Sequence, residues 1–251
     1  MNPLKSNLGF SDINAGRSYM AVQRHEIKYL IPTQMAGQIH AELAQTMTYD
    51  HYSKGNYYPV YTVYFDTTDY QTAEAKLGGV ENRVKYRIRA YYLDRPNYPV
   101  MAEIKQRQNS IILKRRSPIS MKQAQALLLG KDLQPNGGMD ATYHEWRYAR
   151  LAASLRPKSL VVYRRLAFEN HSYPGLRITI DRDVSQTPVS RLQFNKTAMP
   201  VWWGRQFVVL EIKFHGFLPK FVGDLICKYN LTNEAVSKYV DGLVTEITRA
   251  G

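Results

Sequence analysis

The residues of this chain that could do chemistry are carboxylates and bases spaced two apart. Three acid-x-base pairs recur far apart in the sequence: Glu26 and Lys28, Glu103 and Lys105, and Glu211 and Lys213. Side chains two apart on a strand share a face, so each pair would place a carboxylate beside an ammonium group. On a solvated face such pairs contribute only about 0–1 kcal/mol. Facing a ligand, the carboxylates could hold Mg²⁺ or Mn²⁺ while the bases hold phosphate oxygens.

The densest basic pattern lies in residues 82–116. Within residues 83–89 bases and other residues alternate, which would put four bases on one strand face: Arg83, Lys85, Arg87 and Arg89. Four like charges repel one another unless they are solvated or covered by an anion. A solvated sheet face is the common alternative. This alternative is disfavoured here because positive charges are in excess on six predicted strands. The pattern therefore predicts a surface that binds a polyanion.

The elements that must position these residues can be read from periodicity and turn residues. We expect strands at residues 21–31, 57–65, 82–92, 98–107, 110–117, 159–170, 176–184 and 206–214. We expect helices at residues 33–47, 118–129, 141–155, 218–229 and 234–248, with a short one ending at Leu77. Residues 185–205 lack regular periodicity. Short connections favour antiparallel pairing, so the predicted fold is α+β, an eight-stranded antiparallel β-barrel tunnel with helices packed outside.

Composition supports a globular protein with an anionic partner. The chain has 251 residues and a formal net charge of +13. Residues 1–20 are expected to form a loose arm and residues 21–250 a single domain. The lone cysteine, Cys227, excludes an internal disulfide and is expected to be buried in its helix. The sequence has neither a secretory pattern nor an apolar run of about 20 residues, which favours a cytoplasmic setting.

At these residues the sequence resembles the VTC domain of the vacuolar transporter chaperone family, within the triphosphate tunnel metalloenzyme superfamily. The matching stretches are residues 24–30, 64–67, 83–89, 103–105, 114–116, 180–182, 210–214 and 237–239. They follow in order over nearly the whole chain. The resemblance implies a tunnel-forming barrel and a phosphotransferase that polymerises inorganic polyphosphate from the γ-phosphate of ATP. A divalent metal, often manganese, would be the cofactor.

The resemblance also implies roles for particular residues. The phosphate-binding residues would be Lys28, Arg87, Arg89, Lys105, Lys114, Arg165, Lys213 and Ser237. Lys213 is included because it should face the same way as Glu211. For the strand arginine, Arg164 and Arg165 both fit, and strand parity favours Arg165. The catalytic residues would be Lys238, which orients the acceptor phosphate, and Glu211, which binds the metal. Glu26 and Glu103 are further candidate metal ligands, because their side chains are expected on the same inward face of the barrel as Glu211.

Other functions are weighed against this one. The hydrolytic branch of the superfamily carries Glu-x-Glu-x-Lys where this chain has Arg24-x-Glu26-x-Lys28, which favours the polymerase. A triphosphatase is the first alternative, and a non-catalytic polyphosphate-binding module is the second. Nucleic-acid binding is disfavoured because the tunnel carboxylates would oppose it. The aromatic residues that could stack bases are expected to pack in the core or in loops: Tyr91, Tyr92, Trp202 and Trp203.

The remaining expectations concern partners and minor motifs. His25 is expected to be structural, and the six histidines show no metal-ligand spacing. Without a P-loop, nucleotide would be held by its phosphates. We do not expect the regulatory SPX domain or the membrane segments of eukaryotic relatives in this chain. A membrane-protein partner remains open, and the sequence does not predict an oligomeric state.

Overall fold

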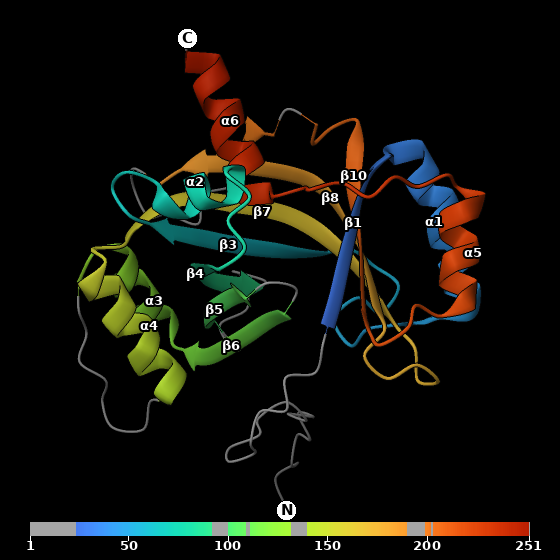
Figure 1. The fold of residues 1–251 in the computed structure, drawn as a ribbon, viewed down its shortest axis with the longest axis horizontal. Helices are drawn as coiled ribbons and strands as arrows, with labels where there is room; N and C mark the ends of the chain where they lie inside the picture. The colour runs from blue at the N-terminus through green and yellow to red at the C-terminus, as the bar shows by residue number, and fades with distance from the viewer. Residues whose placement is uncertain are drawn as a thin grey trace, which may run out of the picture.

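One curled antiparallel sheet organises the protein (Figure 1). The structure is a computed structural model that describes residues 24–91, 100–108, 111–131, 140–189, 199–201 and 203–250. Within these residues, eight long strands follow one another in space as β1 (Arg24–Pro32), β10 (Phe207–His215), β8 (Arg177–Pro188), β7 (Arg156–Glu169), β3 (Tyr58–Asp66), β4 (Arg83–Tyr91), β5 (Val100–Gln108) and β6 (Ile111–Ile119). Two short strands, β2 (Thr48–Tyr49) and β9 (Met199–Pro200), pair with β7 and β8.

The sheet curls into a half-barrel, which confirms the predicted α+β tunnel fold. Its edge strands β1 and β6 approach each other, but no backbone ladder joins them among the described residues. Instead, residues 231–237 run along the free edge of β1. The backbone N–H of Glu234 donates to the carbonyl oxygen of Lys28 at 2.8 Å, and the N–H of Lys28 donates to Asn233 Oδ1 at 3.3 Å. This segment therefore satisfies part of an edge that would otherwise be open.

In the described part of the chain, six helices cover the outside and the ends of the sheet (Figure 1). Helices α1 (Thr33–Thr46) and α5 (Lys220–Lys228) lie together beyond β1 and β10, and α3 (Met121–Leu128) and α4 (Ala141–Ala152) lie beside β5 and β6. Helices α2 (Gln71–Leu77) and α6 (Lys238–Ala250) meet at one end. Apolar residues of the outer strand faces, such as Tyr29 and Ile212, are buried beneath these helices. Burying one such side chain stabilises the fold by about 1.5–3 kcal/mol, so the charged faces turn inward.

The expected helix over residues 118–129 begins later than periodicity suggests. Pro118 lies within β6, and α3 begins at Met121. Because β6 is an edge strand, the missing N–H of Pro118 costs no ladder hydrogen bond. Ser120 then forms a capping box with Gln123, which fixes the helix start.

Other boundaries also depend on tertiary structure. The helix expected from residue 234 starts at Lys238, because the backbone of the preceding residues follows β1. Residues 185–188, expected to be irregular, extend β8. Cys227 is exposed, so its expected burial was wrong. Residues 1–20, the expected loose arm, lie outside the described residues. None of the described helices has the length and apolar character needed to cross a bilayer.

Candidate functional site

Strand parity directs alternate side chains into the concave interior of the sheet. Arg87 and Arg89 of β4 are 9% and 6% exposed, and Glu211 of β10 is 6% exposed. The tandem arginines of β7 separate clearly. Arg165 is 8% exposed, whereas Arg164 is exposed and lies 3.8 Å from the outward Asp183. Arg165 is therefore the member of the pair that faces inward.

A buried carboxylate, Glu103, holds three of the bases together. Its Oε2 lies 2.6 Å from Arg87 Nε and 3.7 Å from Arg89 Nη1, and its Oε1 lies 2.6 Å from Lys114 Nζ. Burial acts to raise the pKa of Glu103, but Arg89, Lys114 and Arg87 outweigh it and hold that pKa well below its usual range. Glu103 is thus ionised at neutral pH, and this Glu103 cluster keeps its bases in position.

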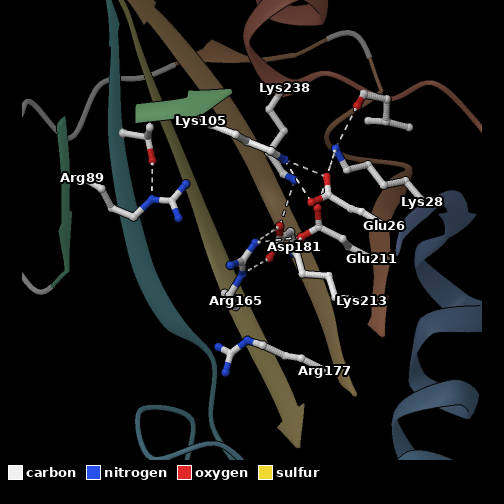
Figure 2. Close-up of polar contacts among 12 residues, drawn as sticks. Glu26, Lys28, Arg89, Lys105, Arg165, Arg177, Asp181, Glu211, Lys213 and Lys238 are labelled. Atoms are coloured by element: carbon white, nitrogen blue, oxygen red, sulfur yellow. Dashed lines mark hydrogen bonds and ion pairs between the residues drawn. The ribbon is translucent and has the colours of Figure 1, made fainter. Parts of the chain in front are cut away.

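A second cluster forms around Glu26 and Glu211, where β1, β5 and β10 face one another (Figure 2). Lys28 Nζ lies 3.1 Å from Glu26 Oε1 and 3.6 Å from Glu211 Oε1. Lys105 Nζ reaches Glu26 from β5 at 3.0 Å, and Lys213 pairs with Glu211. The Lys105–Glu26 ion pair connects β5 with β1, which form no backbone ladder with each other. An ion pair thus bridges these two strands where backbone hydrogen bonds do not.

The pKa values in this Glu26–Glu211 cluster show how closely the charges are balanced. Burial and the neighbouring Glu211 both act to raise the pKa of Glu26, yet Lys28, Lys105 and Lys213 lower it to about 2. Burial lowers the pKa of Lys213 to about 8 although Glu211 opposes the change. Two mutually repelling carboxylates are therefore kept ionised only by the bases between them.

Asp181 of β8 connects this wall of the sheet to α6. Arg165 donates two hydrogen bonds to its carboxylate, from Nε at 2.6 Å and from Nη2 at 2.7 Å. Lys238 Nζ, from the first residue of α6, lies 2.9 Å from Asp181 Oδ2. The Asp181 side chain is fully buried. Lys238 is thus fixed by a carboxylate that the site prediction did not include (Figure 2).

Ser237 and Lys85 meet at the end of the interior next to α2. Lys85 Nζ donates to Ser237 Oγ at 3.4 Å. Burial, followed by the charges of Lys28 and Lys105, lowers the pKa of Lys85 to about 7. Among the described residues no carboxylate lies within ion-pair distance of its ammonium group. Lys85 therefore differs from the other interior lysines described above, each of which has an acidic partner.

Two of the interior carboxylates, Glu26 and Glu211, suit a divalent metal. Glu26 and Glu211 supply oxygen ligands, repel each other and share Lys28, so a cation between them would relieve a real repulsion. Mg²⁺ commonly binds one or two carboxylates and completes its shell with phosphate oxygens and water. Glu103 fits less well because it lies apart from this pair, in the separate cluster with Arg87, Arg89 and Lys114. The described residues contain no group of three or more His, Cys, Asp or Glu side chains placed to hold a metal alone.

The predicted site residues thus fall into two clusters and one separate contact. Arg87, Arg89 and Lys114 surround Glu103. The second set gathers around Glu26, Glu211 and Asp181, and consists of Lys28, Lys105, Arg165, Lys213 and Lys238. Ser237 contacts Lys85 instead. The predicted metal set is divided in this way, since Glu103 does not join the other two carboxylates.

The predicted site did not include the interior residues Asp181, Lys85 and Tyr64. Asp181 and Lys85 lie on predicted charged faces, so parity could have included them. Tyr64 of β3 stacks on Tyr239 with ring centroids 4.9 Å apart. Burial acts to raise the pKa of Tyr64, but Arg87, Arg89 and Lys238 lower it. Its phenol is thus within electrostatic reach of bases from both clusters.

The aromatic residues that could have stacked bases serve packing where they are described. Trp203 is 1% exposed and donates from Nε1 to Asp241 Oδ2 at 3.2 Å. Tyr91 packs against Tyr52 and Tyr58. Tyr92 and Trp202 lie outside the described residues. His25 stacks on Phe214 at 5.0 Å, as expected for a structural residue.

Comparison with known proteins adds a family and a fold. The family model of the VTC domain matches residues 23–246. A solved structure of a candidate adenylate cyclase from Bacillus halodurans aligns with a TM-score of 0.51 at 14% identity, over 86% of this chain and 95% of that chain. A candidate adenylyl cyclase from Hippeastrum, described as having a dominant triphosphatase activity, aligns with a TM-score of 0.47 at 14% identity, over 87% and 94%. No curated protein matches in sequence.

Proposed function

Because the chain belongs to the VTC domain family, we propose that it is a metal-dependent polyphosphate polymerase. This phosphotransferase would move the γ-phosphoryl group of ATP onto a growing inorganic polyphosphate chain. The observation that carries the proposal is the lining of bases through the interior, from Arg177 at one end to Lys105 and Lys114 near the other. Bases at both ends of the interior suit a chain that threads the tunnel.

Phosphoryl transfer requires positioning and charge neutralisation more than covalent chemistry by the protein. In the proposed reaction the bond between the γ-phosphorus and the ADP oxygen breaks, and a bond forms to a terminal oxygen of the chain. ADP leaves, and the chain gains one phosphate. Arg87 and Arg89 would bind phosphate oxygens through their planar guanidinium groups. Lys238, fixed by Asp181, would orient the acceptor phosphate.

The carboxylates have a different part in this proposal. Glu26 and Glu211 would hold a divalent metal, Mn²⁺ or Mg²⁺, which when bound neutralises charge on the phosphates. In the absence of substrate, these carboxylates and Glu103 are the counterions that keep the interior bases ionised and oriented. Phosphate oxygens could replace them without a large rearrangement of the sheet.

The setting and partners follow from the substrate. ATP and inorganic polyphosphate would be the small-molecule partners, and no role for nucleic acid is proposed. Because ATP is the substrate, the proposed location is the cytoplasm. A membrane-protein partner could hold the protein at the inner face of a membrane. Residues 21–250 would act as one tunnel domain, since a single sheet uses strands from residue 24 to residue 215.

Replacement of the acceptor-side lysine tests the proposal. Purified protein is incubated with ATP and Mn²⁺, products are separated by size, and free phosphate is counted. We expect long polymer from the wild type and a loss of about 10²-fold or more in Lys238→Ala, the scale expected when a reacting group is mispositioned. Lys220→Ala is the matched control, because Lys220 is 88% exposed on α5. Free phosphate without polymer would assign the protein to the hydrolases. If neither polymer nor free phosphate forms, the result would support the non-catalytic binding module.

A further inference from the structure

The bases at the α2 end of the tunnel form rows of like charge. Arg83 of β4 lies directly opposite Arg107 of β5. In the next row, Lys85 lies opposite Lys105, which lies opposite Lys114 of β6. Like charges at directly opposed positions destabilise a sheet. The sequence therefore retains a local electrostatic cost at this end of the tunnel.

Carboxylates offset part of that cost at Lys105 and Lys114. Lys105 pairs with Glu26, and Lys114 pairs with Glu103. Lys85, in contrast, has the hydroxyl of Ser237 as its contact, and Arg83 donates to the carbonyl oxygen of Val80. These two contacts of Lys85 and Arg83 supply no negative charge.

Lys76 adds to the same end, because it lies on α2, which packs against β4 and α6. The charges of Arg83 and Lys28 reach it, and Asp241 of α6 is the acidic residue whose charge opposes them. Asp241 is itself occupied by the Trp203 indole and by the backbone N–H of Ser237. It therefore offsets only part of the local positive charge.

Burial along the strands shows that these bases lead outward. On β4, Arg89 and Arg87 are buried, whereas Lys85 and Arg83 are half-buried. On β5, Glu103 is buried, Lys105 is half-buried, and Arg107 is exposed. One row of side chains therefore runs from the Glu103 cluster to solvent. An anion bound among the buried bases could continue along this row only if it were a chain of several charges.

We propose that Lys76, Arg83 and Lys85 form an extension subsite that binds the part of a phosphate chain emerging from the tunnel beyond the segment held inside. The subsite rests on the proposed function and specifies the substrate class at this opening, a linear polyanion longer than triphosphate. Triphosphate bound inside would not reach it. Long chains would therefore gain affinity from these three bases, and triphosphate would not.

Binding without turnover tests the subsite. The affinities of the full chain for tripolyphosphate and for long-chain polyphosphate are measured by calorimetry without ATP. We compare the wild type, Lys76→Ser/Arg83→Ser and the single variant Lys85→Ser. Lys122→Ser/Lys220→Ser removes the same charge from exposed positions on α3 and α5. Losing charge-assisted contacts should weaken long-chain binding about tenfold in the subsite variants and leave tripolyphosphate binding unchanged.

Each outcome either supports or overturns the subsite. Equal losses for both ligands would place these bases in the triphosphate site, and no loss for either would show that they do not bind the chain. The same loss in the control double variant would reduce the effect to net charge. Thermal unfolding shows whether each variant is folded. If Lys76→Ser/Arg83→Ser does not fold, the single variant Arg83→Ser is used in its place.

The polymerase assay separates this inference from the proposed function. If long chains bind through the subsite but ATP yields no polymer, the function fails and the subsite stands. If polymer is made while long-chain affinity is unaltered in the variants, the subsite alone is refuted.

Discussion

Replacement of Glu103 by glutamine probes whether the interior carboxylates act as counterions for absent phosphate. Glu103 is 1% exposed and contacts Arg87 at 2.6 Å, Lys114 at 2.6 Å and Arg89 at 3.7 Å. Glu103→Gln keeps the shape of the side chain and removes its charge. Three bases then remain in the interior without their shared counterion.

The size of the effect follows from burial. Removing one partner of a buried ion pair costs about 3–5 kcal/mol, because the remaining charge stays desolvated. For a chain of this size each kcal/mol lowers the Tm by about 2–4 °C. We therefore expect the Tm of Glu103→Gln to fall by roughly 10 °C in phosphate-free buffer. Glu145→Gln is the matched control, since Glu145 pairs with Arg115 but its side chain is 41% exposed. Such an exposed pair contributes about 0–1 kcal/mol.

A second measurement distinguishes a counterion from an ordinary structural residue. Tripolyphosphate stabilises any folded form that binds it. In the wild type it must compete with Glu103 for the three bases, and in Glu103→Gln it need not. The increase in Tm on adding tripolyphosphate should therefore be larger in the variant. Wild-type stability of Glu103→Gln without phosphate, or a smaller increase with it, would refute the reasoning.

Three further predictions concern other parts of the interior. Burial acts to raise the pKa of Asp181, but Arg165 and Lys238 lower it to about 2. Its ionised form should thus contribute about 2–3 kcal/mol to the free energy of unfolding above pH 5, and this contribution is lost as the pH falls toward 1. Urea unfolding at several pH values measures it. An equal loss of stability at low pH in Asp181→Asn would contradict this. Lys85, with its pKa near 7, should take up a proton when polyphosphate binds at pH 8. Calorimetry in buffers of different ionisation enthalpy should detect that uptake and find none in Lys85→Met, and uptake retained there would exclude Lys85. Glu211→Gln should abolish metal-dependent turnover and leave part of the tripolyphosphate affinity, and near-normal turnover would rule out its metal role.

Strand parity made much of this site predictable. A period of two decides which side chains share a face, so it placed Arg87, Arg89 and Glu211 inside. It also favoured Arg165 over Arg164, and the structure shows Arg165 buried and Arg164 exposed. The family resemblance, which rests on the order of these strands, led to the tunnel fold.

Parity does not say which strands face each other across the interior. Glu26, Glu103 and Glu211 looked equivalent in sequence, yet Glu103 lies in a different cluster. The Asp181–Lys238 pair joins a strand to a helix 57 residues later, a contact that no local pattern encodes. The start of α6 was misplaced for a similar reason, because the N–H of Glu234 bonds to the backbone of Lys28 instead of continuing a helix.

The proposed polymerase activity is decided by where the γ-phosphate of ATP goes. Wild-type protein is incubated with Mn²⁺ and ATP labelled at the γ-position, and label is counted in size-separated polymer and in free phosphate. The account predicts that most released label enters polymer, one phosphate for each ADP formed. Label recovered as free phosphate, with none in polymer, would contradict it.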